Sequence, residues 1–419
     1  MKLELEFLGA CDEVGKSAIL LKHGEKSVLL DYGVKLQPEP VKFPPLVKAD
    51  FVIPTHAHLD HSGAIPTLFK GKILPRVFAT SVTLDLMELL LLDFMKVARL
   101  RGHPQKFTKS EVDRLFLNSF VIDYGQKIRI NDCTLRFYDA GHIPGSTCVL
   151  LECHGKTIFY TGDIKLLSQR LVSGAKLPRR SVDVLIMECT YWNREHPARE
   201  IEEKRLKNEI DLTLNQDETV LIPSFAVARA QEMLLILKDY LDYLAIDGMA
   251  KKASEIMLRK KNRKYVKNAG ELARIYRRVK KIKRANQRKK ILKRPHIIIA
   301  SSGMLNGGPS VYYLKRIRNR RSALLAFVGF QVEDTPGRQV LETGVYRSET
   351  EEFEVNCRIQ RFDFSSHAGR SELLRLISML QPSLVVCVHG EKLRNFAREL
   401  EMEFKLDAIV PKEGDVLEL

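Results

Sequence analysis

Four side chains that can bind a metal ion lie within six consecutive positions of the chain: His56, His58, Asp60 and His61. They follow the apolar run 51–53, which predicts a buried strand that ends in a turn. Because side chains alternate along an extended chain, His56 and His58 point to one side, whereas Asp60 and His61 fall on the next turn and can reach a second ion. Three of the chain's eleven histidines lie here, which argues against a polar turn with accidental histidines. The spacing predicts two metal ions in one pocket.

Hydrolysis at such a centre needs about three protein ligands per ion and an open position for water. His142, Asp163 and His389 are the further candidates, because each lies in a glycine-bearing loop beside an apolar strand. Asp31 ends the apolar run 27–31 and is placed to orient a ligand. Histidines and carboxylates without cysteine suit zinc better than magnesium.

The elements that must position these residues follow from the hydrophobic pattern. Helical periodicity appears around residues 81–101 and near 108–117, and short strands are expected at 3–8, 17–22, 27–31, 51–54, 119–123, 134–138, 147–152 and 157–161. From residue 183 onward, apolar runs repeatedly end on polar or small residues, at 184–187, 220–223, 297–300 and 385–388. These runs predict buried parallel strands with a site beyond their carboxyl ends. Between them, residues 226–243 predict an amphipathic helix, and residues 252–294 are helical in composition.

The composition is that of an ordinary globular protein, since 45% of the 419 residues are hydrophobic and 29% are charged. No window of eighteen apolar residues exists, and the first residues lack the layout of a signal peptide, so we expect a cytoplasmic protein that does not enter membranes. The seven cysteines are scattered and form no C-x-x-C pair. This spacing predicts mostly buried thiols, with neither a disulfide framework nor a cysteine zinc site.

One segment carries the net charge of +16, because residues 251–294 contain twenty Lys and Arg against two acidic residues. Such a block attracts polyanions. Lys280, Lys281 and Arg288 are its candidate contacts to a nucleic-acid backbone. The alternative is a solvated basic helix that serves solubility.

The order of the motifs resembles the metallo-β-lactamase superfamily: Asp31, the H-x-H-x-D-H loop at 56–61, His142 and Asp163. Three further motifs resemble the beta-CASP branch of that superfamily, the nucleic-acid hydrolases that include the cleavage and polyadenylation specificity factor endonuclease and ribonuclease J. They are Glu188 within 187–191, His367 within 364–370 and His389 within 388–391. Segments 222–232 and 300–309 are similar to archaeal and bacterial members of the branch. The resemblance covers nearly the whole chain, and because the lactamase-like motifs begin close to Met1 we expect no amino-terminal KH domains of the kind found in the longest archaeal relatives.

The resemblance implies an α/β fold in which a metallo-β-lactamase αββα sandwich carries an inserted beta-CASP domain, a parallel sheet flanked by helices. The sandwich would comprise residues 1–190 and 363–419, and the inserted domain residues 191–362. Two zinc ions are implied, one at His56, His58 and His142 and the other at Asp60, His61 and His389, with Asp163 bridging them. A histidine at position 389 is associated with RNA cleavage in the family. The resemblance also implies single-stranded RNA as substrate and a homodimer.

The mechanism expected from this resemblance is phosphodiester hydrolysis by a hydroxide held between two zinc ions. His367 would protonate the leaving oxygen, Glu188 would fix its tautomer, and Asp60 and Asp31 complete the catalytic set. The alternative for Glu188 and His367 is that they only close a domain interface. A catalytically silent RNA-binding subunit would lack metal ligands, and a small-molecule hydrolase such as a glyoxalase-II-like thioesterase would lack the beta-CASP motifs.

Candidate contacts to RNA phosphates lie mainly in the second half of the chain. The loop 301–309 precedes a predicted helix, so its backbone N–H groups are a suitable phosphate cradle. A simple turn with an N-cap explains the same residues. The candidates are Ser224, Arg229, Ser302, Gly303, Asn306, Gly307, Arg338 and Ser366. Sequence leaves open whether cleavage is internal or proceeds from an end.

Overall fold

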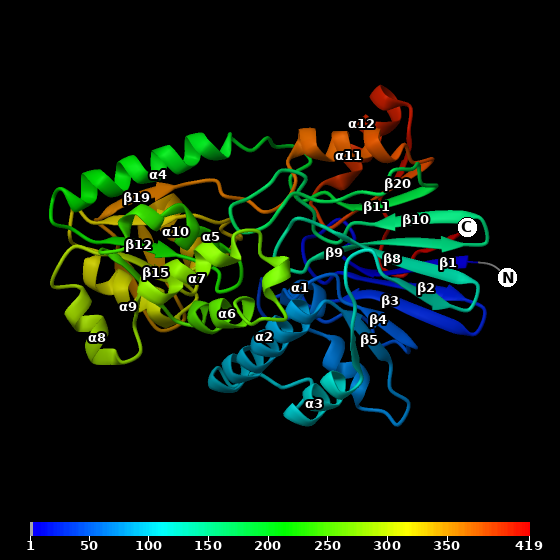
Figure 1. The fold of residues 1–419 in the computed structure, drawn as a ribbon, viewed down its shortest axis with the longest axis horizontal. Helices are drawn as coiled ribbons and strands as arrows, with labels where there is room; N and C mark the ends of the chain where they lie inside the picture. The colour runs from blue at the N-terminus through cyan, green and yellow to red at the C-terminus, as the bar shows by residue number, and fades with distance from the viewer. Residues whose placement is uncertain (1–2) are drawn as a thin grey trace. The chain divides into compact units, whose positions relative to one another are not determined.

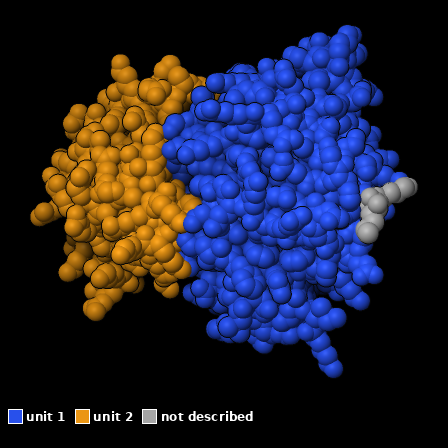
Figure 2. Space-filling view, turned by 45° about the vertical axis from the view of Figure 1, so that its right-hand side comes forward, with its two compact units in different colours: residues 1–168, 172–195, 366–419 blue, residues 169–171, 196–365 orange. Residues whose placement is uncertain are grey.

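The computed structural model describes residues 3–419 and divides the chain into two compact units, shown in different colours in Figure 2. The first contains residues 1–168, 172–195 and 366–419, and the second contains residues 169–171 and 196–365. The predicted domain limits at 190 and 362 lie near these boundaries. The exact limits stay a prediction.

The first unit is built on two seven-stranded sheets (Figure 1). One sheet has, in spatial order, β22 (Val416–Glu418), β1 (Leu3–Gly9), β2 (Ala18–His23), β3 (Lys26–Tyr32), β4 (Phe51–Ile53), β5 (Arg76–Ala79) and β6 (Ser119–Val121). The other has β21 (Asp407–Ile409), β20 (Leu384–Val388), β11 (Val184–Glu188), β10 (Lys156–Tyr160), β9 (Thr147–Cys153), β8 (Cys133–Asp139) and β7 (Lys127–Ile130). β22 and β20, from the end of the chain, complete the two sheets.

Apolar side chains of both sheets meet in one core. In β1, Leu3, Leu5 and Phe7 are buried while Glu4 and Glu6 are half-exposed, which is the alternation that a sheet with one buried face requires. These three residues belong to the same cluster as Phe137 of β8 and Ile158 of β10. The two sheets therefore pack face to face.

Helices cover the outer faces of the sandwich. Leu373 and Leu376 of α11 (Arg370–Leu380) and Phe396 of α12 (Leu393–Phe404) pack with Phe159 and Leu185 of the second sheet. Figure 1 shows α1 (Leu59–Ser62), α2 (Ser81–Leu100) and α3 (Lys109–Leu117) beside β3, β4 and β5 of the other sheet. In the chain, the 3-10 helix η1 (Ile65–Phe69) follows α1 and precedes β5. This is the αββα sandwich that the sequence predicts.

The second unit contains a six-stranded sheet that is parallel throughout. Its spatial order is β14 (Lys280–Lys281), β13 (Leu244–Asp247), β15 (Ile297–Ala300), β12 (Val220–Pro223), β16 (Leu324–Phe327) and β19 (Arg358–Arg361). A separate hairpin pairs β17 (Val345–Arg347) with β18 (Glu352–Glu354). The helices of the unit are α4 (Arg199–Leu214), α5 (Arg229–Ile236), α6 (Ala250–Met257), α7 (Ala269–Arg278), α8 (Ala285–Ile291), α9 (Gly308–Ile317) and α10 (Pro336–Thr343), with 3-10 turns η2 (Lys238–Tyr240) and η3 (Arg263–Tyr265).

Two expectations for this region were wrong in detail. The helix predicted over 226–243 is limited to α5. It cannot begin earlier because Ala228 adopts a φ of 68°, and it ends early because the chain must then form the buried strand β13 of the sheet. The basic segment 251–294 is not one helix, since it is divided into α6, α7 and α8 and also supplies β14. In both cases strand pairing with distant residues overrides local helix propensity.

Cys133 and Cys153 are joined by a disulfide, which departs from the expectation of mostly unlinked thiols. The other five cysteines are free, as expected. Among the residues that the structure describes, no helix is both long enough and apolar enough to cross a membrane.

Candidate metal centre and active site

The histidine loop is held in place by its own backbone. It follows β4, and the short helix α1 begins directly after His58, so that Asp60 and His61 leave the loop on a helical turn. The N–H groups of His61 and Ser62 both donate to the carbonyl of His58, at 3.0 Å each. Gly33 passes so close to this turn that a Cβ there would lie 1.7 Å from the carbonyl oxygen of Asp60. The loop therefore depends on a glycine at position 33.

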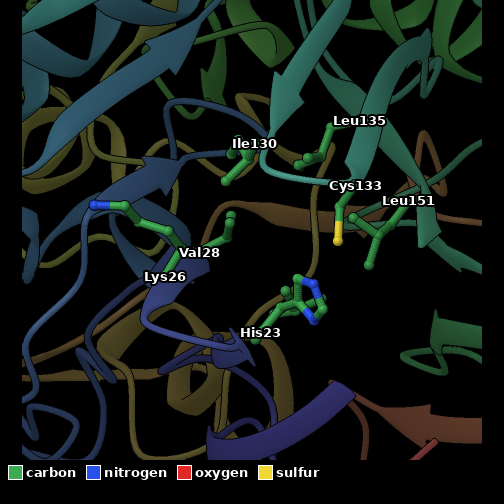
Figure 3. A pocket seen from close by; sticks show the side chains of 8 residues that line it. His23, Lys26, Val28, Ile130, Cys133, Leu135 and Leu151 are labelled. Atoms are coloured by element: carbon green, nitrogen blue, oxygen red, sulfur yellow. The ribbon is translucent and has the colours of Figure 1, made fainter. Parts of the chain in front are cut away.

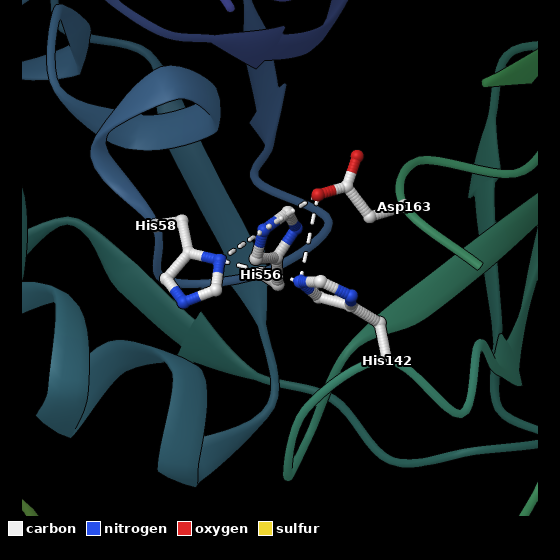
Figure 4. Close-up of side chains that lie close together, drawn as sticks. All are labelled: His56, His58, His142 and Asp163. Atoms are coloured by element: carbon white, nitrogen blue, oxygen red, sulfur yellow. Dashed lines mark hydrogen bonds and ion pairs between the residues drawn. The ribbon is translucent and has the colours of Figure 1, made fainter. Parts of the chain in front are cut away.

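Figure 4 shows the first group of candidate ligands facing a common point. His58 Nδ1 lies 3.1 Å from His56 Nε2 and 3.3 Å from His142 Nε2. Both of these Nε2 atoms lie 3.5 Å from Asp163 Oδ2. Donor atoms at about 2.1 Å from one tetrahedral ion are separated by about 3.4 Å, so the spacing fits a single bound zinc.

The electrostatics of this group also suits a cation. Burial lowers the pKa of His56 and of His142 well below that of an ordinary histidine, despite the nearby Asp163 carboxylate. His142 Nδ1 lies 2.9 Å from the carbonyl oxygen of Ser366, to which it donates as the N–H tautomer. Its Nε2 lone pair is then directed at the cluster, as a metal ligand requires.

A second group lies on the other side of Asp163. His61 Nε2 is 3.1 Å and His389 Nδ1 is 3.4 Å from Asp163 Oδ1. Asp60 Oδ2 is 3.6 Å from His389 Nε2. Asp163 thus presents one carboxylate oxygen to each group, which is the placement that a bridging ligand needs.

Two buried atoms of the second group lack the hydrogen bonds that buried polar atoms normally make. Asp163 Oδ1 and His389 Nε2 make no hydrogen bond of acceptable geometry within the described residues, although His61 and Asp60 lie near them at 3.1 and 3.6 Å. A bound cation would satisfy the carboxylate oxygen directly, and the same holds for a ring-nitrogen lone pair. The residues present therefore fit bound metal ions.

Asp31 positions His61 and is not available as a ligand. Its Oδ1 accepts the N–H of Thr55 at 2.6 Å, and its Oδ2 accepts the hydroxyls of Thr55 and Tyr160 and lies 2.8 Å from His61 Nδ1. Burial opposes the charge on His61, but Asp163 and Asp31 raise the pKa of His61 well above its usual value. Thr55 and Tyr160 were missed from sequence, where Tyr160 looks like a core residue at the end of an apolar strand.

His367 and Glu188 form a pair at the edge of the same cluster. Both carboxylate oxygens of Glu188, at the end of β11, lie 3.0 Å from His367 Nδ1. The N–H of Ile164 and the hydroxyl of Thr190 hold the same carboxylate. Both residues belong to the first unit, as do the candidate metal ligands.

The charge of this pair suits a proton donor. Burial opposes protonation of His367, but the negative charges of Glu188 and Asp163, together with the Glu188 hydrogen bond, raise the pKa of His367 to about 9. His367 Nδ1 lies 3.9 Å from Asp163 Oδ2, so the imidazole is close to the metal ligands. In this arrangement Nδ1 is bound to Glu188 and Nε2 is the nitrogen that can give a proton to another molecule.

The candidate phosphate contacts of the second unit lie at the carboxyl ends of two paired strands, β12 and β15. Ser224 follows β12, and the loop 301–309 follows β15 and begins α9. Ser302 Oγ accepts the N–H of Asn306 at 3.0 Å, so part of the loop is an internally capped turn. A Cβ on Gly303 would lie 2.9 Å from the backbone nitrogen of Phe225, which shows how closely these two loops approach.

The other predicted phosphate contacts are placed differently. Arg229 is the first residue of α5 and is buried, and Arg338 in α10 donates to Glu342 at 2.6 Å. Gly307 lies at the start of α9. Ser366 belongs to the first unit, where its carbonyl oxygen lies 2.9 Å from His142 Nδ1.

Three of the predicted RNA contacts have partners inside the second unit, and their role in RNA binding stays a prediction. Arg288 donates to the buried carboxylate of Asp247 at 2.7 and 3.2 Å. Lys281 donates to the last carbonyls of α7, and Lys280 Nζ lies 2.8 Å from His296 Nε2. A charge pattern cannot reveal these partners, because they depend on the tertiary fold.

Comparisons with protein families match three consecutive parts of the chain. A beta-lactamase superfamily domain matches residues 27–236, a Beta-Casp domain matches residues 230–340, and a Zn-dependent metallo-hydrolase RNA specificity domain matches residues 352–411. The Beta-Casp match includes the whole basic segment 251–294.

Several archaeal proteins are similar along nearly the whole chain. A protein named "Probable RNase MJ4" from Methanocaldococcus jannaschii is 37% identical, with full coverage of both chains. "RNase aCSPSF2" from Saccharolobus solfataricus is 33% identical over all of this chain and 86% of its own length. "Transcription termination factor FttA" from Pyrococcus abyssi is 35% identical over 98% of this chain and 70% of its own length.

A solved structure supports the fold alone. The crystal structure of a protein of unknown function from Enterococcus faecalis V583 matches with a TM-score of 0.61 and 12% identity over the whole of both chains.

Proposed function

This chain belongs to the Beta-Casp family of metallo-hydrolases built on the beta-lactamase superfamily fold, as its motifs predict, and from that membership we infer that it is a metal-dependent ribonuclease. The observation that carries the inference is that all seven candidate metal ligands are present and lie close to the pair formed by His367 and Glu188. A catalytically silent binding subunit would not need this set. A small-molecule hydrolase would not need the RNA specificity domain.

We assign one zinc ion to His56, His58 and His142 and a second to Asp60, His61 and His389, with Asp163 between them. Support comes from the ligand spacing, from the two faces of the Asp163 carboxylate and from the buried atoms without hydrogen bonds. When bound, such ions supply an activated water at neutral pH and positive charge opposite the phosphate.

The protein's own residues then have separate tasks. His367 holds a proton at Nε2 for the leaving ribose oxygen, while Glu188 holds Nδ1 and fixes the tautomer. Asp31 orients His61, and the Ser366 carbonyl orients His142. The acid and the ligand set lie in one unit, so the proposed chemistry does not depend on the position of the second unit.

We propose that the second unit contributes sequence-independent contacts to RNA through exposed basic residues of the segment 251–294. Arg277, Arg278, Lys283, Lys289 and Lys290 are exposed and replace the three engaged residues as the principal candidates. Changing these five to glutamine should flatten the dependence of RNA affinity on salt concentration. An unchanged slope would favour the solubility role.

Single-stranded RNA and a homodimer remain predictions from the family resemblance, and a cytoplasmic location remains a prediction from the composition and the first residues. The first test is to incubate zinc-loaded protein with one RNA labelled separately at its 5′ and 3′ ends, beside DNA of the same sequence. We expect metal-dependent cleavage of RNA alone, and none by a His56→Ala, His58→Ala variant. Fragments would indicate internal cleavage and mononucleotides cleavage from an end. Binding without cleavage would overturn the assignment in favour of a binding subunit.

A further inference from the structure

A second group of metal-binding side chains lies at the opposite end of the sandwich from the catalytic cluster. His23 ends β2, Cys133 begins β8, Cys153 ends β9, and His154 follows in the turn to β10. The catalytic residues lie at the other end of the sheets, since Asp31 lies near the end of β3, which begins just after His23, and His142 lies beyond the end of β8. β3 has seven residues, so the two groups are separated by about 20 Å.

The four side chains converge from three hairpin turns and from both sheets. The ligand atoms of His23, Cys153 and His154 lie within 4.8 Å of one another, and the Cys133 sulfur is bonded to that of Cys153. The Nε2 atoms of His23 and His154 are 3.1 Å apart. His23, Cys133 and Cys153 are buried, whereas His154 is exposed in its turn.

Two features of His23 favour a cation here. Its Nε2 faces Nε2 of His154. Two neutral rings can make this contact only if one of the two nitrogens carries a proton. A cation between the rings would instead bind the lone pairs of both nitrogens. The Nδ1 of His23 is buried and has no hydrogen-bonding partner among the described residues.

A small cavity adjoins the group. Figure 3 shows the Cys133 sulfur and the His23 ring pointing toward one another across it, and Lys26 also lines it. Its volume of about 10 Å³ is too small for an organic ligand but sufficient for one ion or water. Lys26 is directed to Asp50, with its Nζ 3.3 Å from Oδ1, so its charge is compensated.

We propose that the reduced chain binds one structural zinc ion at His23, Cys133, Cys153 and His154. Two thiolates with two imidazoles form a complete tetrahedral zinc set that leaves no position for water, so the role is structural and not catalytic. The ion would join the first sheet, which supplies His23, to the second, which supplies the other three ligands. A disulfide between the two cysteines excludes this ion, so the bonded and zinc-bound forms are alternatives. The site escapes a search for C-x-x-C pairs because its ligands come from separate hairpins.

The test is a titration of the full chain with Co²⁺ after reduction and removal of metal, without oxygen. We expect thiolate-to-cobalt charge-transfer absorption, which the catalytic ligands cannot produce because they contain no sulfur. A Cys133→Ser, Cys153→Ser variant should lose the absorption, and the His56→Ala, His58→Ala variant should keep it. Cys11→Ser, which changes a half-exposed free cysteine, is the matched control and should also keep it.

Zinc content and thiol counting give independent readouts. The double cysteine variant should carry one zinc ion fewer per chain than the wild type when both are loaded with zinc. Alkylation of the denatured zinc-bound protein without reductant should label all seven cysteines, whereas a disulfide would leave five. If the double variant does not fold, His154→Ala changes an exposed turn residue and should weaken cobalt binding at least tenfold. Absence of the charge-transfer band in the reduced wild type would overturn the proposal, as would equal zinc contents of wild type and folded variant.

Discussion

Replacing His367 by alanine should abolish most RNA cleavage without removing the metal ions. The Glu188 carboxylate holds the imidazole through Nδ1 at 3.0 Å, and against the opposing effect of burial the charges of Glu188 and Asp163 raise the pKa of His367 to about 9, which favours the protonated form. Loss of a positioned general acid typically costs about 10²- to 10⁴-fold in rate. This equals about 3 to 5 kcal/mol of transition-state stabilisation. The metal ligands do not include His367, so zinc content should stay at the wild-type value.

The assay compares two leaving groups under single-turnover conditions. Cleavage of RNA expels a ribose alkoxide that needs a proton, whereas a p-nitrophenyl phosphodiester expels an anion that is stable at neutral pH. His367→Ala should therefore slow RNA cleavage by the full factor but slow the nitrophenyl ester by less than about tenfold. Glu188→Gln keeps the shape of the pair and should give a smaller loss with the same substrate dependence.

Two results would refute this reasoning. A variant that retains zinc and cleaves RNA at the wild-type rate would show that His367 is not the acid. Equal losses on the two substrates would assign His367 a structural or binding role, because the loss would not depend on the proton requirement of the leaving group.

Three further predictions concern residues away from the reacting atoms. Tyr160→Phe removes a 2.8 Å hydrogen bond to Asp31 and should weaken zinc binding about 10-fold or more, as measured by competition with a chelator. Arg288→Ala removes the guanidinium from the fully buried Asp247, which keeps the Tyr313 hydroxyl and the Gly248 N–H, and should destabilise the protein by about 1 to 3 kcal/mol in urea unfolding, with an unchanged salt dependence of RNA binding. Burial raises the pKa of Asp139 from 3.8 to about 6, although the hydrogen bond from the Gly141 N–H partly offsets this. The folded protein therefore holds the Asp139 proton more tightly than the unfolded chain, so this stabilisation is present below pH 4 and is lost as the pH rises through 6. Asp139→Asn should therefore become more stable relative to wild type between pH 4 and pH 7, by up to about 3 kcal/mol in unfolding titrations, and a constant difference would contradict this.

The sequence was most informative where function depends on local spacing. His56, His58, Asp60 and His61 lie on one loop, so their types and intervals predict a metal centre, and the structure places His142 and His389 close to them. The strands could also be predicted from the sequence, because a strand with one buried face, such as β1, alternates apolar and polar residues.

Partners that are distant in sequence could not be predicted in this way. Tyr160 lies 129 positions from Asp31, and the Ser366 group that orients His142 is a backbone carbonyl, which no residue type reveals. The run of basic residues likewise gave no sign that Arg288 donates hydrogen bonds to the buried carboxylate of Asp247, 41 positions away. Such pairings are set by strand order and by the crossing of the chain between layers, and local patterns contain neither.

The metal centre depends on the relative position of the two sheets of the sandwich. The histidine loop follows β4 of the first sheet, whereas Asp163 and His389 follow β10 and β20 of the second. The interval of 3.1 Å between His61 Nε2 and Asp163 Oδ1 is therefore a distance between sheets, and a relative shift of about 1 Å would exceed the tolerance of zinc coordination. The core fixes this position by packing, and the proposed ion at His23, Cys133, Cys153 and His154 would fix it again at the opposite end. Loss of that ion should thus lower the zinc affinity of the catalytic ligands although none of them is changed.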